Sequence, residues 1–363
     1  MHLKKLSLFN FRSYAVVKFD FSEGINCIVG GNGSGKTNLL DAIHFLALTK
    51  SSLNNIDQEN IRHDNNAFSI RGEFFRDKGV EEIKCKVARN SRKEISFNDV
   101  LYERISDHIG RIPLILMTPN DTDLIRGGSE VRRKLFDNIL SQSNHDYLEN
   151  FLYYNKVLRQ RNAALKSMSQ TNRTDSTLLD TYDEELVAHA IKLSNWRDNF
   201  LKDFLPVFCQ RYDMISGGAE KVDIYYKSDC KNDHFKTVLR RSREQDIKLQ
   251  RTCVGVHRDD FVFSLENSKI KQHGSQGQQK SFVTALKISQ ADIISKQKGN
   301  LPIILMDDIF DKLDDLRIDR LLSYVVETGS QVFITDARPE RTKALLLNNN
   351  IEAKYTFINK EIK

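Results

Sequence analysis

The chain has 363 residues, 40% of them hydrophobic, so it can bury a substantial core in one large domain or in two or three smaller ones. Its net charge of +6 permits a nucleic-acid partner but favours one only slightly over an ordinary enzyme. Five dispersed cysteines exclude a disulfide framework or a CxxC zinc site. No apolar run is long enough for a signal sequence or a membrane span, so we expect a cytoplasmic protein with no membrane partner.

The first 120 residues have the pattern of strands around a glycine-rich turn. The runs 25–29 and 112–117 predict short buried strands. Apolar residues between 66 and 97 suggest antiparallel strands that turn near Gly79. A helix is expected after the glycines, because apolar residues recur there at helical spacing, namely Leu39, Ile43 and Leu46.

The centre of the chain, from about 129 to 208, has helical periodicity. A polar break at 169–176 predicts a loop between two long helices. Sustained heptads, which a coiled coil would require, are missing, so we expect a compact helical lobe. The last third returns to an α/β pattern, with helices from Gln276 and Leu316 and strands at 303–306 and 332–334.

Residues 30–37, Gly-Gly-Asn-Gly-Ser-Gly-Lys-Thr, fit the phosphate-loop pattern G-x-x-x-x-G-K-[ST]. Glycines let backbone N–H groups converge on phosphate oxygens, Lys36 would reach the β- and γ-phosphates, and the Thr37 hydroxyl would ligate Mg²⁺. A simple glycine-rich turn is the structural alternative, but a buried strand before it and a helix after it are what phosphate binding requires. The expected ATP-binding residues are Gly30, Gly31, Asn32, Gly33, Ser34, Gly35, Lys36, Thr37 and the next position, Asn38.

The apolar run 303–306 ends in two carboxylates, Asp307 and Asp308. In a phosphate-loop protein the first is placed to hold Mg²⁺, and the second would orient or deprotonate the attacking water. With Lys36 they form the expected catalytic set, whereas alone they would equally fit a solvated acidic turn. Lys36 and Asp307 stand near opposite ends of the chain, so their strands would have to meet in one sheet around a large insertion.

A third element, Ser275-Gln276-Gly277-Gln278, opens a helix upstream of the acidic strand and looks like the S-x-G-Q signature of ABC ATPases. A serine hydroxyl, a glycine backbone and the positive end of a helix together suit a γ-phosphate. In the ABC class this segment contacts the ATP bound by the other subunit. An ordinary capped helix is the alternative. Residues 310–314 then resemble the D-loop, with Asp314 expected at the dimer seam.

The chain from about residue 3 to 336 resembles the RecF family of bacterial recombination mediators, which are relatives of the Rad50 and SMC heads without their long arms. The runs Leu-Arg-Gln-Arg-Asn and Gly-Val-His-Arg-Asp-Asp-Phe make the resemblance specific to RecF, because the phosphate loop and the acidic strand occur in many families. The runs that carry it are 10–14, 118–121, 128–134, 158–162, 255–261 and the segment around Ser275.

This resemblance implies an α/β fold, a P-loop ABC-type ATPase head with a mixed β-sheet and an inserted all-helical lobe. The head would comprise residues 1–120 and 241–363, and the helical lobe 121–240. ATP sandwiched in a homodimer would clamp duplex DNA near single-strand gaps without sequence specificity. Weak, DNA-stimulated hydrolysis would serve as a switch. RecR and RecO are the implied partners, with RecA loaded indirectly, in repair, replication, recombination and the SOS response.

Several positions depart from the ABC pattern. Asp308 stands where transporters usually carry Glu, which is compatible with slow turnover. No His follows the last strand, where many ABC proteins place a γ-phosphate sensor, and Thr335 or Asp336 occupies that region. Asn120 is the nearest candidate for the Gln loop. For the run 257–260, His-Arg-Asp-Asp, a buried ion-pair turn and a functional site are equally open.

Two basic clusters are candidates for DNA contact. Such side chains would neutralise phosphates and give salt-sensitive, sequence-blind binding. A solvated helix face is the alternative, because acids such as Glu244 and Asp246 interrupt the charge, and no aromatic stacking motif is apparent. The clusters are Lys156, Arg159, Arg161 and Lys166 in the helical lobe, and Arg240, Arg241, Arg243, Lys248 and Arg251 further on.

Three other functions would use the same ATP chemistry. A transporter subunit would need a membrane partner and fits the distant signature poorly. An SMC- or Rad50-like DNA organiser would need long heptad arms, which are missing. An ATP-dependent nuclease would need a further carboxylate cluster, and none is apparent beyond Asp307 and Asp308.

Overall fold

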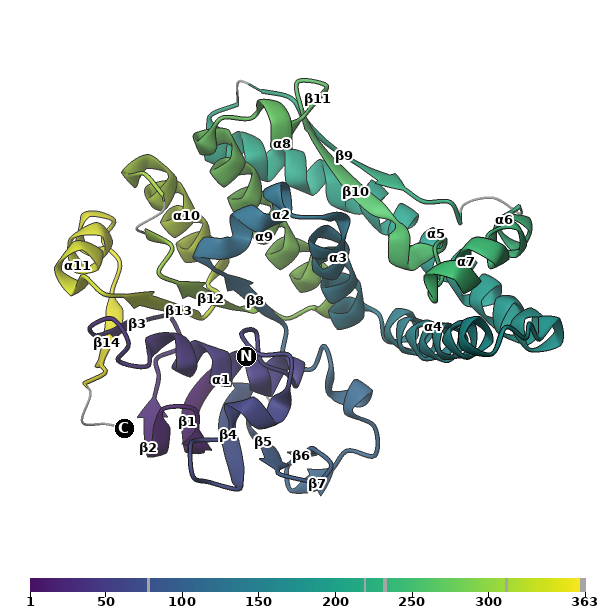
Figure 1. Ribbon diagram of the computed structural model, residues 1–363. Coiled ribbons are helices and arrows are strands. Elements are labelled where there is room, and N and C mark those ends of the chain that lie inside the picture. The colour runs from purple at the N-terminus through teal and green to yellow at the C-terminus, as the bar shows by residue number, and fades with distance from the viewer. Residues whose placement is uncertain (77–78, 219, 231–233, 311–312, 360–363) are drawn as a thin grey trace. The chain divides into compact units, whose positions relative to one another are not determined.

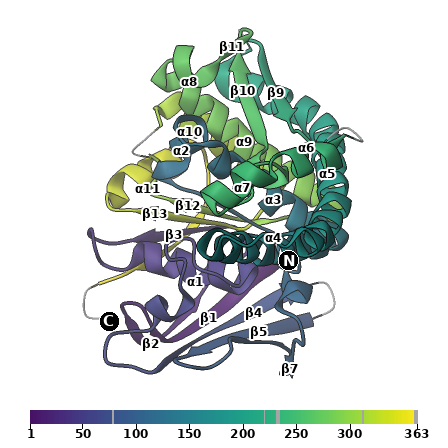
Figure 2. The same cartoon turned by 45° about the vertical axis from the view of Figure 1, so that its right-hand side comes forward.

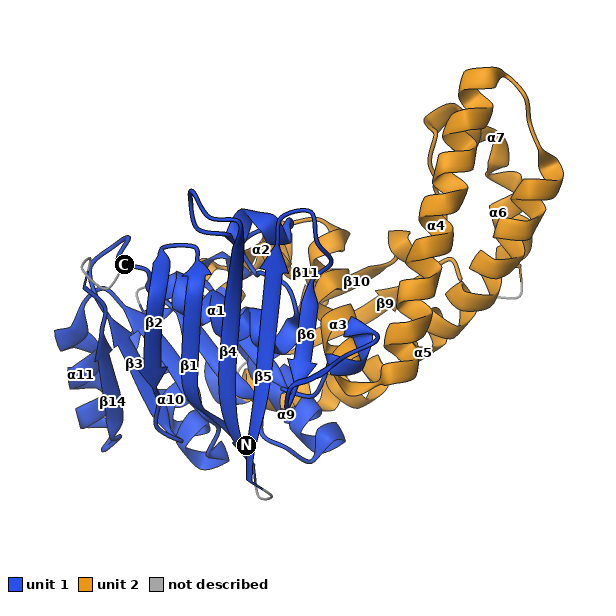
Figure 3. Cartoon of the chain, turned by 90° about the horizontal axis from the view of Figure 1, so that it is seen from below, with its two compact units in different colours: residues 1–121, 214–218, 280–363 blue, residues 122–213, 219–279 orange. Residues whose placement is uncertain are grey.

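The computed structural model describes residues 1–363 apart from 77–78, 219, 231–233, 311–312 and 360–363. The chain divides into two compact units, coloured separately in Figure 3. Unit 1 contains residues 1–121, 214–218 and 280–363, and unit 2 contains 122–213 and 219–279. The expected end of the inserted lobe at 240 therefore falls inside unit 2, which continues to Gln279.

Unit 1 contains two β-sheets. The first is antiparallel, in the order β2-β1-β4-β5-β6-β7, and the second is parallel, in the order β14-β3-β13-β12-β8. The bounds of the antiparallel strands are β1 His2–Phe11, β2 Tyr14–Asp20, β4 Ala67–Arg76, β5 Gly79–Ala88, β6 Glu94–Phe97 and β7 Val100–Leu101. Those of the parallel strands are β3 Ile25–Val29, β8 Leu114–Met117, β12 Ile303–Asp307, β13 Val332–Asp336 and β14 Ala353–Phe357.

Helix α1, Lys36–Leu48, lies between the two sheets (Figures 1 and 2). Eleven of its 13 residues are buried, as expected for a helix that has apolar neighbours on all sides. The parallel sheet packs its other face against helices α9, Gln276–Lys298, α10, Asp315–Thr328, and α11, Pro339–Asn348. The first and last thirds of the chain thus share one core, which confirms the α/β class.

Unit 2 is mainly helical, but it also contains a three-stranded antiparallel sheet in the order β11-β10-β9. An all-helical lobe was expected. Strand β9 has alternating buried and exposed residues and pairs with β10 in a register that sets Tyr226 opposite Phe261. This pairing joins segments far apart in sequence, which local periodicity does not reveal. The strands are β9 Val222–Lys227, β10 Asp260–Leu265 and β11 Ser268–Lys269.

The helices of unit 2 include the two long ones predicted around the polar break. They are α4, of 27 residues, and α5, of 41 residues, and the break between them lies at 172–175. The bounds are α2 Asp123–Arg126, α3 Ser129–Ser143, α4 His145–Thr171, α5 Ser176–Ser216, α6 Phe235–Arg241, α7 Arg243–Leu249 and α8 Ile270–His273. Within the described residues, the helices are all too short or too polar to cross a lipid bilayer.

Candidate nucleotide site

The phosphate loop joins the fully buried strand β3 to α1. Gly33 and Gly35 have φ angles of 73° and 114°, which a residue with a Cβ adopts only with strain. A Cβ on Gly30 would lie 2.5 Å from the carbonyl oxygen of Ile358, so this position also excludes side chains. The loop conformation therefore requires glycine at three of the expected positions.

The middle of the loop, Gly31 to Gly33, is exposed, whereas Ser34 and Lys36 are buried beneath it. The Ser34 hydroxyl is buried without a hydrogen-bond partner among the described residues. A buried polar atom of this kind needs a partner to offset its desolvation, and a phosphate oxygen would supply one. The loop chemistry therefore fits a phosphate ligand.

Lys36 extends over the loop rather than into solvent. Its Nζ donates to the carbonyl oxygens of Gly30 and Gly31 at 2.9 and 3.2 Å. These contacts hold the ammonium group against the loop backbone, where a point charge can neutralise bound phosphates.

The hydroxyl of Thr37 donates to Oδ1 of Asp307 at 3.1 Å, and the hydroxyl of Thr335 donates to the same oxygen at 2.7 Å. Strand β13, which carries Thr335, lies between β3 and β12 in the sheet. The first turn of α1 and the ends of β12 and β13 therefore meet at one carboxylate, although Thr37 and Asp307 stand far apart in the sequence. The pairing of the phosphate loop with the acidic strand is as predicted.

Asp308 is half-buried and has a φ of 46°. Its backbone N–H donates to the Thr335 hydroxyl at 2.9 Å, so one threonine fixes both acidic positions. Left-handed backbone is unusual for a residue with a side chain, although Asp tolerates it better than most. Sequence reasoning placed Thr335 in this region but did not foresee its contact with Asp307.

Residues of the turn between β1 and β2 form hydrogen bonds with the phosphate loop and the start of α1. The Tyr14 hydroxyl donates to the carbonyl oxygen of Gly35 at 3.0 Å. Asn38 donates to the Ser13 hydroxyl at 2.9 Å, so this side chain binds the turn. Arg12 forms an ion pair with buried Asp41 at 3.0 Å. The run 10–14 therefore anchors α1, which the sequence alone did not indicate.

The signature segment begins α9. The Ser275 hydroxyl accepts from the N–H of Gln278 at 3.2 Å, and the Gln278 side chain accepts from the N–H of Ser275 at 2.6 Å. This reciprocal pattern is a capping box, so the capped-helix alternative describes its local structure. Ser275 and Gln276 are nevertheless exposed at the positive end of a 23-residue helix.

The expected D-loop lies partly outside the described residues, because 311–312 are among those the structure leaves out. Asp314 caps α10 by accepting from the N–H of Arg317 at 3.1 Å. Burial opposes ionisation of this carboxyl, but hydrogen bonds from Arg317 outweigh it and lower the pKa of Asp314. Asn120, the Gln-loop candidate, is exposed, and its neighbour Asp121 pairs with Lys287 at 3.0 Å.

The His-Arg-Asp-Asp run forms a buried ion-pair network inside unit 2, one of the two alternatives. Arg197 on α5 binds Asp259 at 3.1 Å and both carboxylate oxygens of Asp137, at 2.9 and 3.0 Å. Asp260 accepts from two nitrogens of Arg132, at 2.8 and 3.0 Å. The run therefore ties β10 to helices α3 and α5.

The two basic clusters are only partly available to a ligand. Arg161 is fully buried against Asp183 and Asp246, each at 2.7 Å, so it cannot contact DNA from this position. Arg243 likewise pairs with Asp180 and Asp183. The remaining members are exposed, namely Lys156, Arg159 and Lys166 on α4, and Arg240, Arg241, Lys248 and Arg251.

A glycine loop between a buried strand and a helix, with an acidic strand end held next to it, defines an ATPase head of the P-loop class. In agreement, residues 1–113 match the AAA ATPase domain family. Two SMC head structures share the fold at TM-scores of 0.56, with 17 and 18% identity.

Relatives named DNA replication and repair protein RecF match almost the whole chain. The protein from Cytophaga hutchinsonii is 43% identical over 99% of this chain and 96% of its own length. The protein from Flavobacterium johnsoniae is 42% identical over 95% of this chain and 97% of its own length. The solved structure of the recombination mediator protein RecF-ATPrS in the RecFOR pathway aligns with a TM-score of 0.88 at 28% identity, covering 99% of this chain and 96% of that one. The structure of RecF-ATP in the same pathway aligns with a TM-score of 0.84 at 29% identity, covering 93% of this chain and 92% of that one. The chain belongs to the RecF family of DNA replication and repair proteins.

Proposed function

We propose that this chain is an ATP-gated, DNA-binding recombination mediator of replication and repair. The carrying observation is that the phosphate loop, Asp307 and Thr335 converge in one hydrogen-bonded site. Full-length similarity to RecF proteins, including one solved as RecF-ATP, supports ATP as the ligand. Because these relatives match nearly end to end, an SMC-like organiser and a nuclease are not favoured.

Mg²⁺ is the metal that fits this site. Thr37 and Asp307 offer a hydroxyl and a carboxylate, which are the oxygen ligands that Mg²⁺ takes together with nucleotide phosphates. The ion would neutralise charge on the β- and γ-phosphates. Within the chain, Lys36 would stabilise phosphate charge, Asp307 would hold the metal ion, and Asp308 would orient the attacking water. With aspartate in that role, we expect slow hydrolysis that acts as a switch.

The exposed signature supports dimerisation by ATP. Ser275 and the N-terminus of α9 present a hydroxyl and a positive helix end to solvent. These groups suit the γ-phosphate of an ATP bound to a second copy, as in the ABC class. Two copies would then enclose two nucleotides.

DNA is the expected macromolecular partner of the closed dimer, with duplex near single-strand gaps as the preferred form. Exposed cations in unit 2 would bind phosphates without reading sequence, for example Lys156, Arg159 and Lys166. RecR- and RecO-like mediators are the proposed protein partners, with recombinase loading as the outcome.

The test is binding to a fluorescent gapped duplex with ATP, with ADP and without nucleotide, while sedimentation reports the oligomeric state. We expect ATP with Mg²⁺ alone to give a DNA-bound dimer. Lys36→Met should abolish both dimer and tight DNA binding, because phosphate charge is no longer neutralised. Ser275→Arg should leave ATP binding by the monomer intact and block the dimer. DNA binding that ignores nucleotide, with no dimer, would contradict the proposal.

A further inference from the structure

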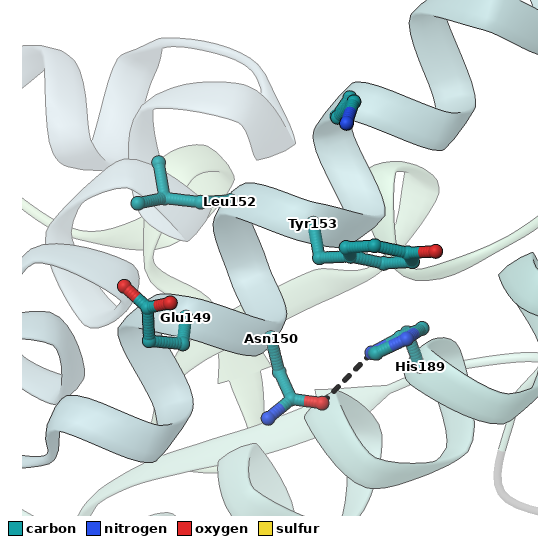
Figure 4. Close-up of a pocket in the computed structure, with 6 residues that line it drawn as sticks. Glu149, Asn150, Leu152, Tyr153 and His189 are labelled. Atoms are coloured by element: carbon teal, nitrogen blue, oxygen red, sulfur yellow. Dashed lines mark hydrogen bonds between the residues drawn. The ribbon is translucent and has the colours of Figure 1, made fainter.

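A shallow pocket of about 380 Å³ lies on unit 2, on the surface of α4 and α5. Figure 4 shows its lining side chains, with the Tyr153 ring above that of His189. The lining residues are Glu149, Asn150, Leu152, Tyr153 and Lys156 from α4 and His189 from α5. Nothing in the nucleotide site uses any of them.

The Tyr153 ring is held in place by two residues of α5. Its centroid lies 4.5 Å from that of His189, and a hydrogen bond to Glu185 raises the pKa of its hydroxyl. The residue is still 40% exposed, and its neighbour Leu152 is 46% exposed. The ring therefore packs on His189 at a tilt of 38° while part of the side chain stays accessible to a ligand at the pocket.

His189 is fixed as a neutral support for this ring. The Asn150 amide nitrogen donates to the carbonyl oxygen of Asp146 at 2.8 Å, so its oxygen faces His189 Nδ1, also at 2.8 Å. Nδ1 therefore carries the proton and donates it. Burial and nearby Lys192 lower the pKa of His189, which outweighs Glu185 and keeps the imidazole uncharged at neutral pH.

The helix that carries Tyr153 is free of acids beyond the pocket. No Asp or Glu occurs between Glu149 and Asp175, whereas this stretch contains five cations, of which Arg161 is buried. Lys156, Arg159 and Lys166 are exposed and recur at helical spacing, so they form one stripe about 15 Å long that starts beside Tyr153. The stripe is complementary to a phosphate backbone.

The carboxylate of Glu149 at the pocket rim disfavours a phosphate inside the pocket itself. A nucleobase is uncharged, has a flat face for the tyrosine ring, and offers amino groups that a carboxylate accepts. A nucleotide strand with one base in the pocket and its phosphates along the basic stripe would match both features. In a paired duplex the bases are stacked inside the helix, so the occupant must be unpaired.

We propose that Tyr153, with Lys156 and Arg159, forms a binding site for an unpaired nucleotide of single-stranded DNA, with its base stacked on the tyrosine. This inference rests on the proposed DNA binding and deepens it, because it gives the chain a means of distinguishing a gap from continuous duplex.

The experiment uses the full chain with ATP and Mg²⁺ and two DNAs of equal length, a blunt duplex and a gapped duplex with 2-aminopurine at its first unpaired position. Binding of the wild type should quench the 2-aminopurine fluorescence. Tyr153→Ala should lose the quenching and weaken gapped-DNA binding by about tenfold, with blunt-duplex affinity within about twofold of wild type. Tyr153→Phe keeps the ring and should retain the quenching.

Tyr225→Ala is the matched control, because Tyr225 is 46% exposed on β9 of the same unit and should have no effect. Lys156→Ala should weaken binding to both DNAs. It should also reduce the slope of the logarithm of the binding constant against the logarithm of salt concentration by about one. Equal quenching and gapped-DNA affinity for wild type and Tyr153→Ala would overturn the inference and leave this face to a protein partner. A wild type that binds neither DNA would instead refute the proposed function, and with it the Tyr153 site for single-stranded DNA.

Discussion

Thr335 is the residue on which the geometry of the acidic strand end depends. Its hydroxyl donates to Asp307 and accepts from the backbone of Asp308, so it joins the proposed metal-binding and water-orienting positions. Many ABC proteins place a histidine in this region, but here a buried threonine on the middle strand fixes the acids. Thr335 therefore acts through the two aspartates, as a positioning residue.

We expect Thr335→Val to slow ATP turnover by about tenfold with little change in ATP affinity. Valine has nearly the same shape but leaves the Asp308 N–H without its acceptor, at a cost of about 1–3 kcal/mol. Single-turnover hydrolysis and nucleotide binding would measure the two effects. Thr335→Ser retains the hydroxyl and should restore most of the rate, whereas turnover by Thr335→Val at the wild-type rate would show that the contact has no role.

At the scale of elements, buried arginines join the helices of unit 2. Arg161 on α4 binds Asp183 on α5 and Asp246 on α7, and Thr252 also accepts from it at 2.9 Å. Arg159, two residues earlier, is exposed. The same basic run therefore contains an exposed arginine and a buried one, and only the packing of α4 against its neighbours determines which is which.

Arg161→Met should destabilise the chain by about 3–5 kcal/mol, because it removes the cation that pairs with buried Asp246 and leaves buried Asp183 with Arg243 alone. Arg159→Ala should change stability by less than about 0.5 kcal/mol. Urea unfolding followed by circular dichroism would compare the midpoints. The assignment of Arg161 to the interior fails if the two variants unfold at the same urea concentration.

At the scale of the whole molecule, buried neutral histidines couple the fold to pH. Burial lowers the pKa of His108 to about 4, despite its contact with the carbonyl oxygen of Leu46 at 2.6 Å. Burial also lowers the pKa of His257 to about 4. The His257 Nε2 lies 3.0 Å from the carbonyl oxygen of Thr252, and its Nδ1 lies 2.7 Å from the Tyr154 hydroxyl, which can donate to the neutral ring.

Between pH 6.5 and about 4 the unfolded chain binds protons at these histidines that the folded chain does not. Folding stability should therefore be constant above about pH 6.5 and fall as the pH is lowered to 4, by about 3 kcal/mol for each histidine. His257→Gln should reduce this slope, and the exposed His63→Gln should leave it unchanged. Urea midpoints between pH 4 and 8 provide the measurement. Identical slopes for both variants would rule out His257 as a source.

The sequence by itself indicated the α/β class, the phosphate loop and its acidic partner, because glycines, apolar runs and the carboxylates at a strand end code those features locally. It also indicated the family, through the short runs at 158–162 and 255–261. Only the tertiary structure decided that Thr335 binds Asp307, that Arg161 is interior, that β9 pairs with β10, and that Tyr153 stays open beside Lys156. Each of these depends on which distant segments pack together. A charged or aromatic residue has the same local pattern whether its neighbours in space are water, a carboxylate or another ring.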